Sequence, residues 1–134
     1  MNEARLTESL DERGLLTAAQ GPGVYALGVP VPSMPSVARE QWDAVHDARP
    51  PDDALARLAE APRVAYVGAS SQVYDRLCDH VAGDVRTTAF LAAFDPAAVI
   101  NVWPHDAPFD AEVTRALRLA REDWVVWCDG EVWG

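Results

Sequence analysis

Two tyrosine triplets and a nearby arginine–histidine pair are the residues of this chain whose types and spacing suit chemistry. The triplets are Gly23-Val24-Tyr25 and Tyr66-Val67-Gly68, and Arg76 and His80 follow the second triplet. A spacing of four puts Arg76 and His80 on one face of a helix. A guanidinium is well shaped to bind phosphate oxygens, and an imidazole titrates near neutral pH and can relay a proton. If the two strands pair in register, both phenols lie beside that helix, where the four side chains suit phosphodiester chemistry.

Each of these residues also has a purely structural explanation. Tyr25 and Tyr66 are of a type that is common in strands. Arg76 can pair with Asp79 or with another of the many surface carboxylates. His80 can be an exposed residue at a helix end, where the helix dipole favours a cation. The joint occurrence of the four residues, and not any one of them, favours a functional interpretation.

Alternating strand-like and helix-like segments must position these side chains. The pattern predicts strands over residues 24–29, 63–67 and 98–103, helices over 2–18, 37–47, 51–60, 70–81, 87–94 and 108–122, and a hairpin over 124–133. Gly68 is expected to end the second strand with a sharp turn that leaves the site open. The order of elements indicates an α/β or α+β class with a small sheet. The length of 134 residues fits one domain over 1–134, with an insertion at about 30–62.

The charge balance is strongly acidic. Eleven basic residues, all of them arginine, face 21 acidic ones, and the formal net charge is -10. This composition is typical of proteins adapted to strong salt, as in halophilic archaea and their viruses, and an ordinary acidic protein from a high-GC bacterium is the alternative. Such a charge normally argues against binding nucleic acid. In molar salt the Debye length is only ~3 Å, so that objection loses most of its force.

The cysteines and the apolar runs narrow the class further. Cys78 and Cys128 are far apart and lack the spacing of a zinc site, which predicts two buried or half-buried free thiols. The apolar runs are far shorter than the ~20 residues that a membrane span needs, and no secretory leader opens the chain. The sequence therefore predicts a cytoplasmic protein that does not associate with membranes.

The triplets and the arginine–histidine pair together resemble the GIY-YIG nuclease superfamily. There the motifs G-[IV]-Y, Y-[IV]-G and R-L-x-x-[YH] follow one another, and here they stand at residues 23–25, 66–68 and 76–80. The resemblance covers residues 15–82 with one large insertion. It implies a small, mainly antiparallel sheet flanked by helices, with a helical insertion between the first two strands. It also implies an endonuclease that cleaves DNA with Mg²⁺ or Mn²⁺.

The resemblance also implies roles for individual residues. Tyr25 orders the site, Tyr66 helps to activate water, and His80 completes the catalytic cluster. Arg76 also belongs to the catalytic cluster and, together with Gly68, to the part that binds the substrate phosphate.

Family members also carry a metal-binding glutamate on the helix after the third strand, in a pattern like E-A-x-x-x-E. In this sequence Glu112 matches the first glutamate of that pattern, and Leu117 stands at the position of the metal ligand. A helix shifted by about one turn would let Glu112 take over as the metal ligand. A catalytically inactive GIY-YIG-fold module that binds nucleic acid or protein is therefore the alternative function. A third possibility is a small acidic interaction protein whose tyrosine motifs are accidental.

Aromatic and basic residues near the end of the chain suggest two further surfaces. Trp124 and Trp127 should point to opposite faces of a strand, so that one can be exposed and support a homodimer through the Trp-rich hairpin. Arg115, Arg118 and Arg121 form a basic strip along the last helix, either for a phosphate backbone or as a solvated face.

Overall fold

A computed structural model describes residues 1–45, 52–83 and 87–134. Parts of the predicted helices over 37–47 and 51–60 lie outside these residues. The helices are α1 (Glu3–Glu12), the 3-10 turn η1 (Ala18–Gln20), α2 (Pro35–Asp43), α3 (Asp52–Glu60), α4 (Val73–Ala82), α5 (Ala89–Ala93) and α6 (Pro108–Ala120). The strands are β1 (Gly23–Gly28), β2 (Val64–Ser70), β3 (Ala98–Pro104), β4 (Val125–Cys128) and β5 (Glu131–Trp133).

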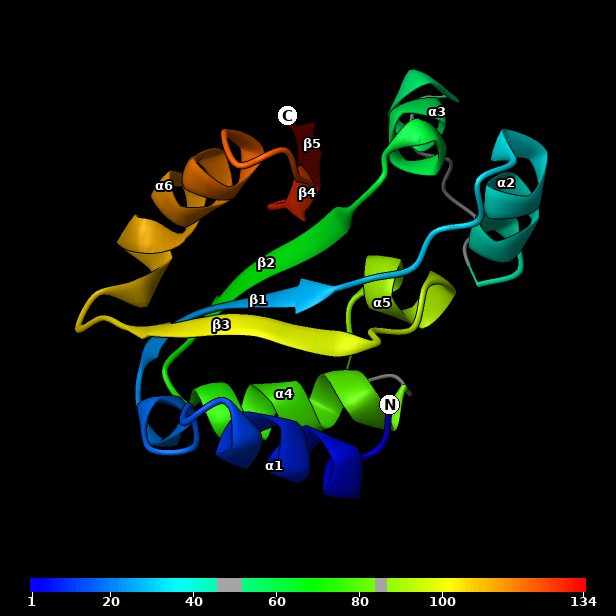
Figure 1. Cartoon of the computed structure of the whole chain (residues 1–134). Helices are drawn as coiled ribbons and strands as arrows, with labels where there is room; N and C mark the ends of the chain where they lie inside the picture. Colours follow the sequence, from blue (N-terminus) through cyan, green and yellow to red (C-terminus); the bar gives the residue numbers. More distant parts are fainter. Residues whose placement is uncertain (46–51, 84–86) are drawn as a thin grey trace.

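The five strands form one sheet in the order β3-β1-β2-β4-β5 (Figure 1). β1 lies between β3 and β2 and runs antiparallel to both. β4 runs parallel to β2 over Val64–Tyr66 and antiparallel to β5. The prediction of an α+β fold with a small, mainly antiparallel sheet is therefore confirmed.

Helices cover both faces of the sheet (Figure 1). Successive side chains of a strand point to opposite faces, so β1 divides its residues between two hydrophobic clusters. Tyr25 and Leu27 face α1, α4 and α5, whereas Val24 and Ala26 face α6. The candidate tyrosine of β1 consequently lies on the α4 side of the sheet.

Helices α2 and α3 occupy the connection between β1 and β2, where the sequence predicts a helical insertion. They pack on each other, and Trp42, Leu55 and Leu58 join the larger of the two clusters. The indole of Trp42 lies 5.7 Å from that of Trp127, between ring centroids. The insertion thus extends the larger hydrophobic cluster next to Trp127 of β4.

Several predicted boundaries are wrong. β2 continues through Gly68 to Ser70, so Gly68 does not end the strand in a turn. Helix α4 begins at Val73 after Gln72, and Ser70 accepts a hydrogen bond from the Gln72 N–H without capping the helix. The first helix ends at Glu12, and a 3-10 turn follows because Gly14, at φ +68°, takes the left-handed conformation.

The core stripe of α6 also differs from the prediction. The sequence pattern places Val113, Ala116, Leu117 and Ala120 on one face of this helix, but Leu117 is 40% exposed, whereas Leu119 is buried beside Ala116. The face of α6 that carries Ala116 and Leu119 packs on the sheet, and Leu117 lies outside that face. In this orientation of α6, the side chain of Glu112 is half-buried.

The cysteines and the hairpin at residues 124–133 follow the sequence pattern. Cys78 is a half-buried free thiol and Cys128 a buried one. Trp124 and Trp127 pack against different clusters, as predicted for residues on opposite faces. Both are half-buried, and the Arg63 guanidinium lies over Trp124 at 4.3 Å. Within the described ranges, no helix combines the length and apolarity that crossing a bilayer requires.

Candidate active site

The register of β1 against β2 brings the two tyrosines together. Tyr25 pairs with Gly68, and Tyr66 pairs with Leu27, so both phenols stand on the α4 face of neighbouring strands. Their ring centroids lie 6.3 Å apart. The register of the two strands thus brings the two triplets together.

Gly68 makes room for the Tyr25 ring. A Cβ atom at this position would lie 2.5 Å from Tyr25 Cζ and 2.9 Å from Cε2, and closer still to the hydroxyl. The expected sharp turn is wrong because Gly68 lies inside β2. The glycine is needed because the phenol lies directly over the opposite strand.

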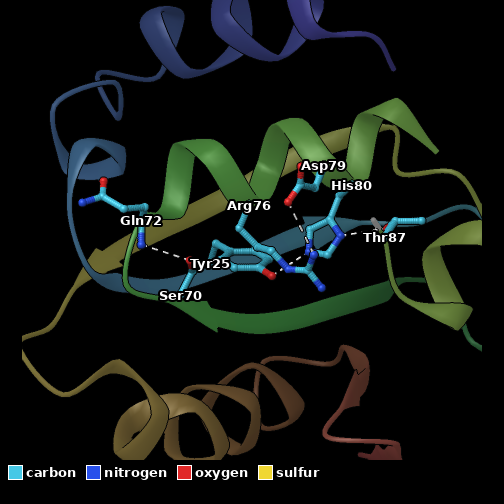
Figure 2. A network of polar contacts seen from close by, with 7 residues as sticks. All are labelled: Tyr25, Ser70, Gln72, Arg76, Asp79, His80 and Thr87. Carbon is cyan, nitrogen blue, oxygen red and sulfur yellow. Dashed lines mark hydrogen bonds and ion pairs between the residues drawn. The ribbon is translucent and has the colours of Figure 1, made fainter. Parts of the chain in front are cut away.

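Helix α4 supplies the third and fourth predicted side chains (Figure 2). Val73 and Leu77 anchor the helix in the core, and Arg76 and His80 point toward Tyr25. The Tyr25 hydroxyl is hydrogen-bonded to His80 Nε2 at 2.6 Å. The imidazole centroid lies 5.5 Å from each phenol centroid. All four residues thus belong to one cluster.

His80 is not the exposed helix-end residue of the structural alternative. Its side chain is 0% exposed, and Nδ1 is hydrogen-bonded to Thr87 Oγ1 at 2.8 Å. Burial, together with the nearby Arg76 guanidinium, lowers the pKa of His80 to about 3. The imidazole is therefore neutral at physiological pH, with one nitrogen that donates and one that accepts.

Arg76 forms the ion pair that the structural interpretation predicts, with Asp79 at 3.7 Å. Its positive charge also favours the ionised form of Tyr25 and so opposes part of the rise in the pKa of that hydroxyl. Its side chain is 32% exposed, so solvent screens the ion pair and makes it weak. Arg76 is thus the most exposed of the four side chains of the cluster.

The two phenols are deprived of water to different degrees. Tyr25 is 1% exposed and Tyr66 8%. Burial raises the pKa of both hydroxyls above the ordinary tyrosine value, so both stay protonated at neutral pH. They can therefore orient an oxygen by hydrogen bonding but are poor proton acceptors.

Glu112 approaches the cluster from the opposite face of the sheet. Because β4 pairs with β2 only as far as Tyr66, a cavity of about 330 Å³ opens beyond the end of this pairing. Tyr66, Thr88, Glu112, Trp127 and Asp129 are among the residues that line it. The predicted carboxylate and one predicted phenol thus share a cavity, whereas Tyr25, Arg76 and His80 are not among the described residues that line it.

The Glu112 carboxylate is half-buried and accepts a hydrogen bond from the Cys128 thiol at 3.4 Å. Burial raises the pKa of Glu112 and also that of Cys128. Cys128 therefore remains a neutral thiol that donates. The Glu112 carboxylate is therefore easier to protonate than that of an exposed glutamate.

The cavity offers oxygen ligands to a divalent cation. Across residues 1–45, 52–83 and 87–134, no three or more His, Cys, Asp and Glu side chains are grouped to hold a metal ion. Mg²⁺ is commonly held by one or two carboxylates together with waters and substrate phosphates. The carboxylates of Glu112 and Asp129 in one cavity fit such a cation, whereas Leu117 is not among the lining residues.

The sequence did not identify two contributors to this region. Asp129 was expected only as a hairpin turn residue, and Thr87 only as the start of a short helix. Both lie at positions where local pattern signals a change of direction, and their neighbours in space come from other elements. The side chain of Arg115, in contrast, bonds His105 and lies over Trp103, so it does not extend toward the cluster.

Comparison of the chain with family models, with curated proteins and with solved structures found no match in any of the three.

Proposed function

We propose that this protein is a GIY-YIG-type endonuclease that hydrolyses phosphodiester bonds in DNA with Mg²⁺ or Mn²⁺. The observation that carries the proposal is the convergence of Tyr25, Tyr66, Arg76 and His80 on one face of the β1–β2 pair. Three elements that are separate in sequence supply these residues. Ordinary strand packing accounts for two buried tyrosines, but it does not require a guanidinium at their hydroxyl end.

The residues divide into an inner and an outer part. Tyr25 and His80 are buried, and in this proposal they orient their neighbours without touching DNA. Arg76 is half-exposed and donates to a phosphoryl oxygen, which stabilises the charge that grows there during hydrolysis. The neutral Tyr66 hydroxyl orients the attacking water or a phosphoryl oxygen at the wall of the cavity.

Glu112 would act on the opposite side of the cavity. With Asp129, it would hold the divalent cation, which supplies charge neutralisation at the phosphate when bound. The raised pKa of Glu112 makes its carboxylate a better proton acceptor than that of an exposed glutamate. His80 is not assigned that task, because its low pKa and its burial separate it from a substrate.

The test is a nicking assay on plasmid and branched DNA with Mg²⁺ or Mn²⁺, in low salt and in molar KCl. We expect Arg76→Ala, Tyr66→Phe and Glu112→Gln each to lower cleavage about 100-fold or more, the range for losing a charge-stabilising or proton-transfer group. Arg5→Ala is the matched control, because it removes an exposed arginine from α1, outside the cluster and the cavity, and should leave cleavage unchanged.

A binding module without cleavage is the second candidate function. The observation that favours it is the bond between Glu112 and the Cys128 thiol, which occupies the carboxylate that a cation would need. Binding of DNA that weakens with salt, without nicking under any of these conditions, would identify this function. Absence of both binding and cleavage would leave an interaction protein whose tyrosine motifs are accidental.

A further inference from the structure

A chain of hydrogen bonds runs through the buried half of the cluster (Figure 2). The Tyr25 hydroxyl lies 2.6 Å from His80 Nε2, and the positive charge of Arg76 acts on the same hydroxyl. On the other side of the imidazole, His80 Nδ1 lies 2.8 Å from Thr87 Oγ1. The chain thus joins His80 of α4 to Tyr25 of β1 and to Thr87, which precedes α5. None of the roles considered above involves Thr87.

The positive charge of Arg76 favours one direction for the bond between Tyr25 and His80. A guanidinium has only donors, so the Tyr25 hydroxyl is favoured with its oxygen toward Arg76 and its proton away from it. The hydroxyl proton of Tyr25 then points to another acceptor. His80 Nε2, at 2.6 Å, is in position to receive it.

The neutral imidazole carries this direction to Thr87. Because His80 is buried and its pKa is lowered, only one of its two nitrogens bears a proton. If Nε2 accepts from Tyr25, the proton is on Nδ1. A buried N–H without an acceptor is strongly unfavourable, and the Thr87 hydroxyl oxygen is the acceptor at hydrogen-bonding distance.

We propose that Thr87 is a positioning residue that holds His80 in the Nδ1–H tautomer, so that Tyr25 donates to Nε2 and keeps its oxygen directed at Arg76. Thr87 does not touch the substrate in this scheme. It acts through the imidazole and the phenol on the guanidinium that meets the phosphate. The tautomer is a property of the folded chain, and only the effect on cleavage rests on the proposed function.

The test measures the His80 tautomer by NMR on the whole protein labelled with ¹⁵N, at neutral pH and without DNA. Correlations between the ring nitrogens and ring protons tell which nitrogen bears hydrogen, and backbone correlations assign the signals to His80. We expect Nδ1–H in the wild-type protein. A proton on Nε2 would overturn the proposal, whatever the variants show.

Two substitutions at Thr87 sharpen the test. Thr87→Val keeps the shape of the side chain without its hydroxyl, and we expect the tautomer ratio to move about tenfold toward Nε2–H. Thr87→Ser keeps a hydroxyl and should retain the Nδ1–H form. An unchanged tautomer in Thr87→Val would refute the role of the threonine. If that variant does not fold, the wild-type protein and Thr87→Ser still decide the matter.

Cleavage kinetics separate this inference from the proposed function. If the protein nicks DNA, Thr87→Val should lower kcat about tenfold with little change in KM, and Thr87→Ser should recover most of the loss. Equal kcat in the valine variant and the wild-type protein would refute a positioning role. A wild-type protein that shows the Nδ1–H tautomer and no cleavage would refute the nuclease but not the tautomer assignment.

Discussion

Substituting Gly68 with alanine tests how tightly the two tyrosine-bearing strands specify the cluster. The new methyl group would lie 2.5 Å from Tyr25 Cζ and 2.9 Å from Cε2. No real Cβ comes that close to an aromatic carbon, so the ring has to move. Tyr25 is 1% exposed and packed between β2 and α4, and it cannot move without leaving His80 Nε2.

The size of the effect follows from these two consequences. Overpacking a filled core typically costs about 1–3 kcal/mol. Leaving the buried nitrogen of His80 without its partner adds about 1–3 kcal/mol. We therefore expect Gly68→Ala to lower the free energy of unfolding by about 2–6 kcal/mol, a large part of the stability of a typical domain.

Urea unfolding with fluorescence detection measures this loss, and Gly28→Ala is the matched control. Gly28 also lies at a strand position, but a Cβ there would meet its nearest atom, Ala98 Cβ, at 3.7 Å. That variant should differ from wild type by less than about 1 kcal/mol. In a Tyr25→Leu background the additional effect of Gly68→Ala should become small. Equal effects of the two alanine substitutions in the wild-type background would refute the steric argument.

Three further predictions concern the polar groups of the site. Tyr25→Phe removes the partner of His80 Nε2 and should lower the free energy of unfolding, measured in urea, by about 1–3 kcal/mol. Folding lowers the pKa of His80 from 6.5 to about 3, so between these two pH values the unfolded chain binds a proton that the folded chain does not. The free energy of unfolding should therefore fall as the pH drops below about 6, by up to ~1.4 kcal/mol per pH unit. A His80→Gln variant should lose this component of the slope. Cys128→Ala removes the donor to Glu112 and should raise the pKa of that carboxyl further in an NMR titration, whereas Cys128→Ser should not.

The sequence predicted those parts of the fold that depend on local rules. The Asp129-Gly130 pair forms the expected hairpin because both residues take positive φ, +53° and +75°. β1 spans Gly23–Gly28, shifted by one residue from the predicted strand over 24–29. Once β1 pairs with β2 in the observed register, Tyr25 and Tyr66 lie on the same face of the sheet, because side chains alternate between the two faces along a strand.

Features that depend on neighbours distant in sequence could not be predicted in the same way. The burial of His80 depends on Tyr25 and Thr87, which satisfy both ring nitrogens. Leu117 is exposed because the sheet contacts the neighbouring face of α6, which carries Ala116 and Leu119. The role of Gly68 depends on the side chain of its cross-strand partner and not on its own backbone angles.

The parallel pairing of β4 with β2 has a consequence for the order of folding. Val64 pairs with Val125, so this contact joins segments from the two halves of the chain, and closing such a long loop is slow compared with local pairing. We expect the three strands β3, β1 and β2 to assemble first and the hairpin of β4 and β5 to dock afterwards. Until it docks, one edge of β2 presents unpaired backbone groups, which is the kind of edge that captures strands from other chains during refolding.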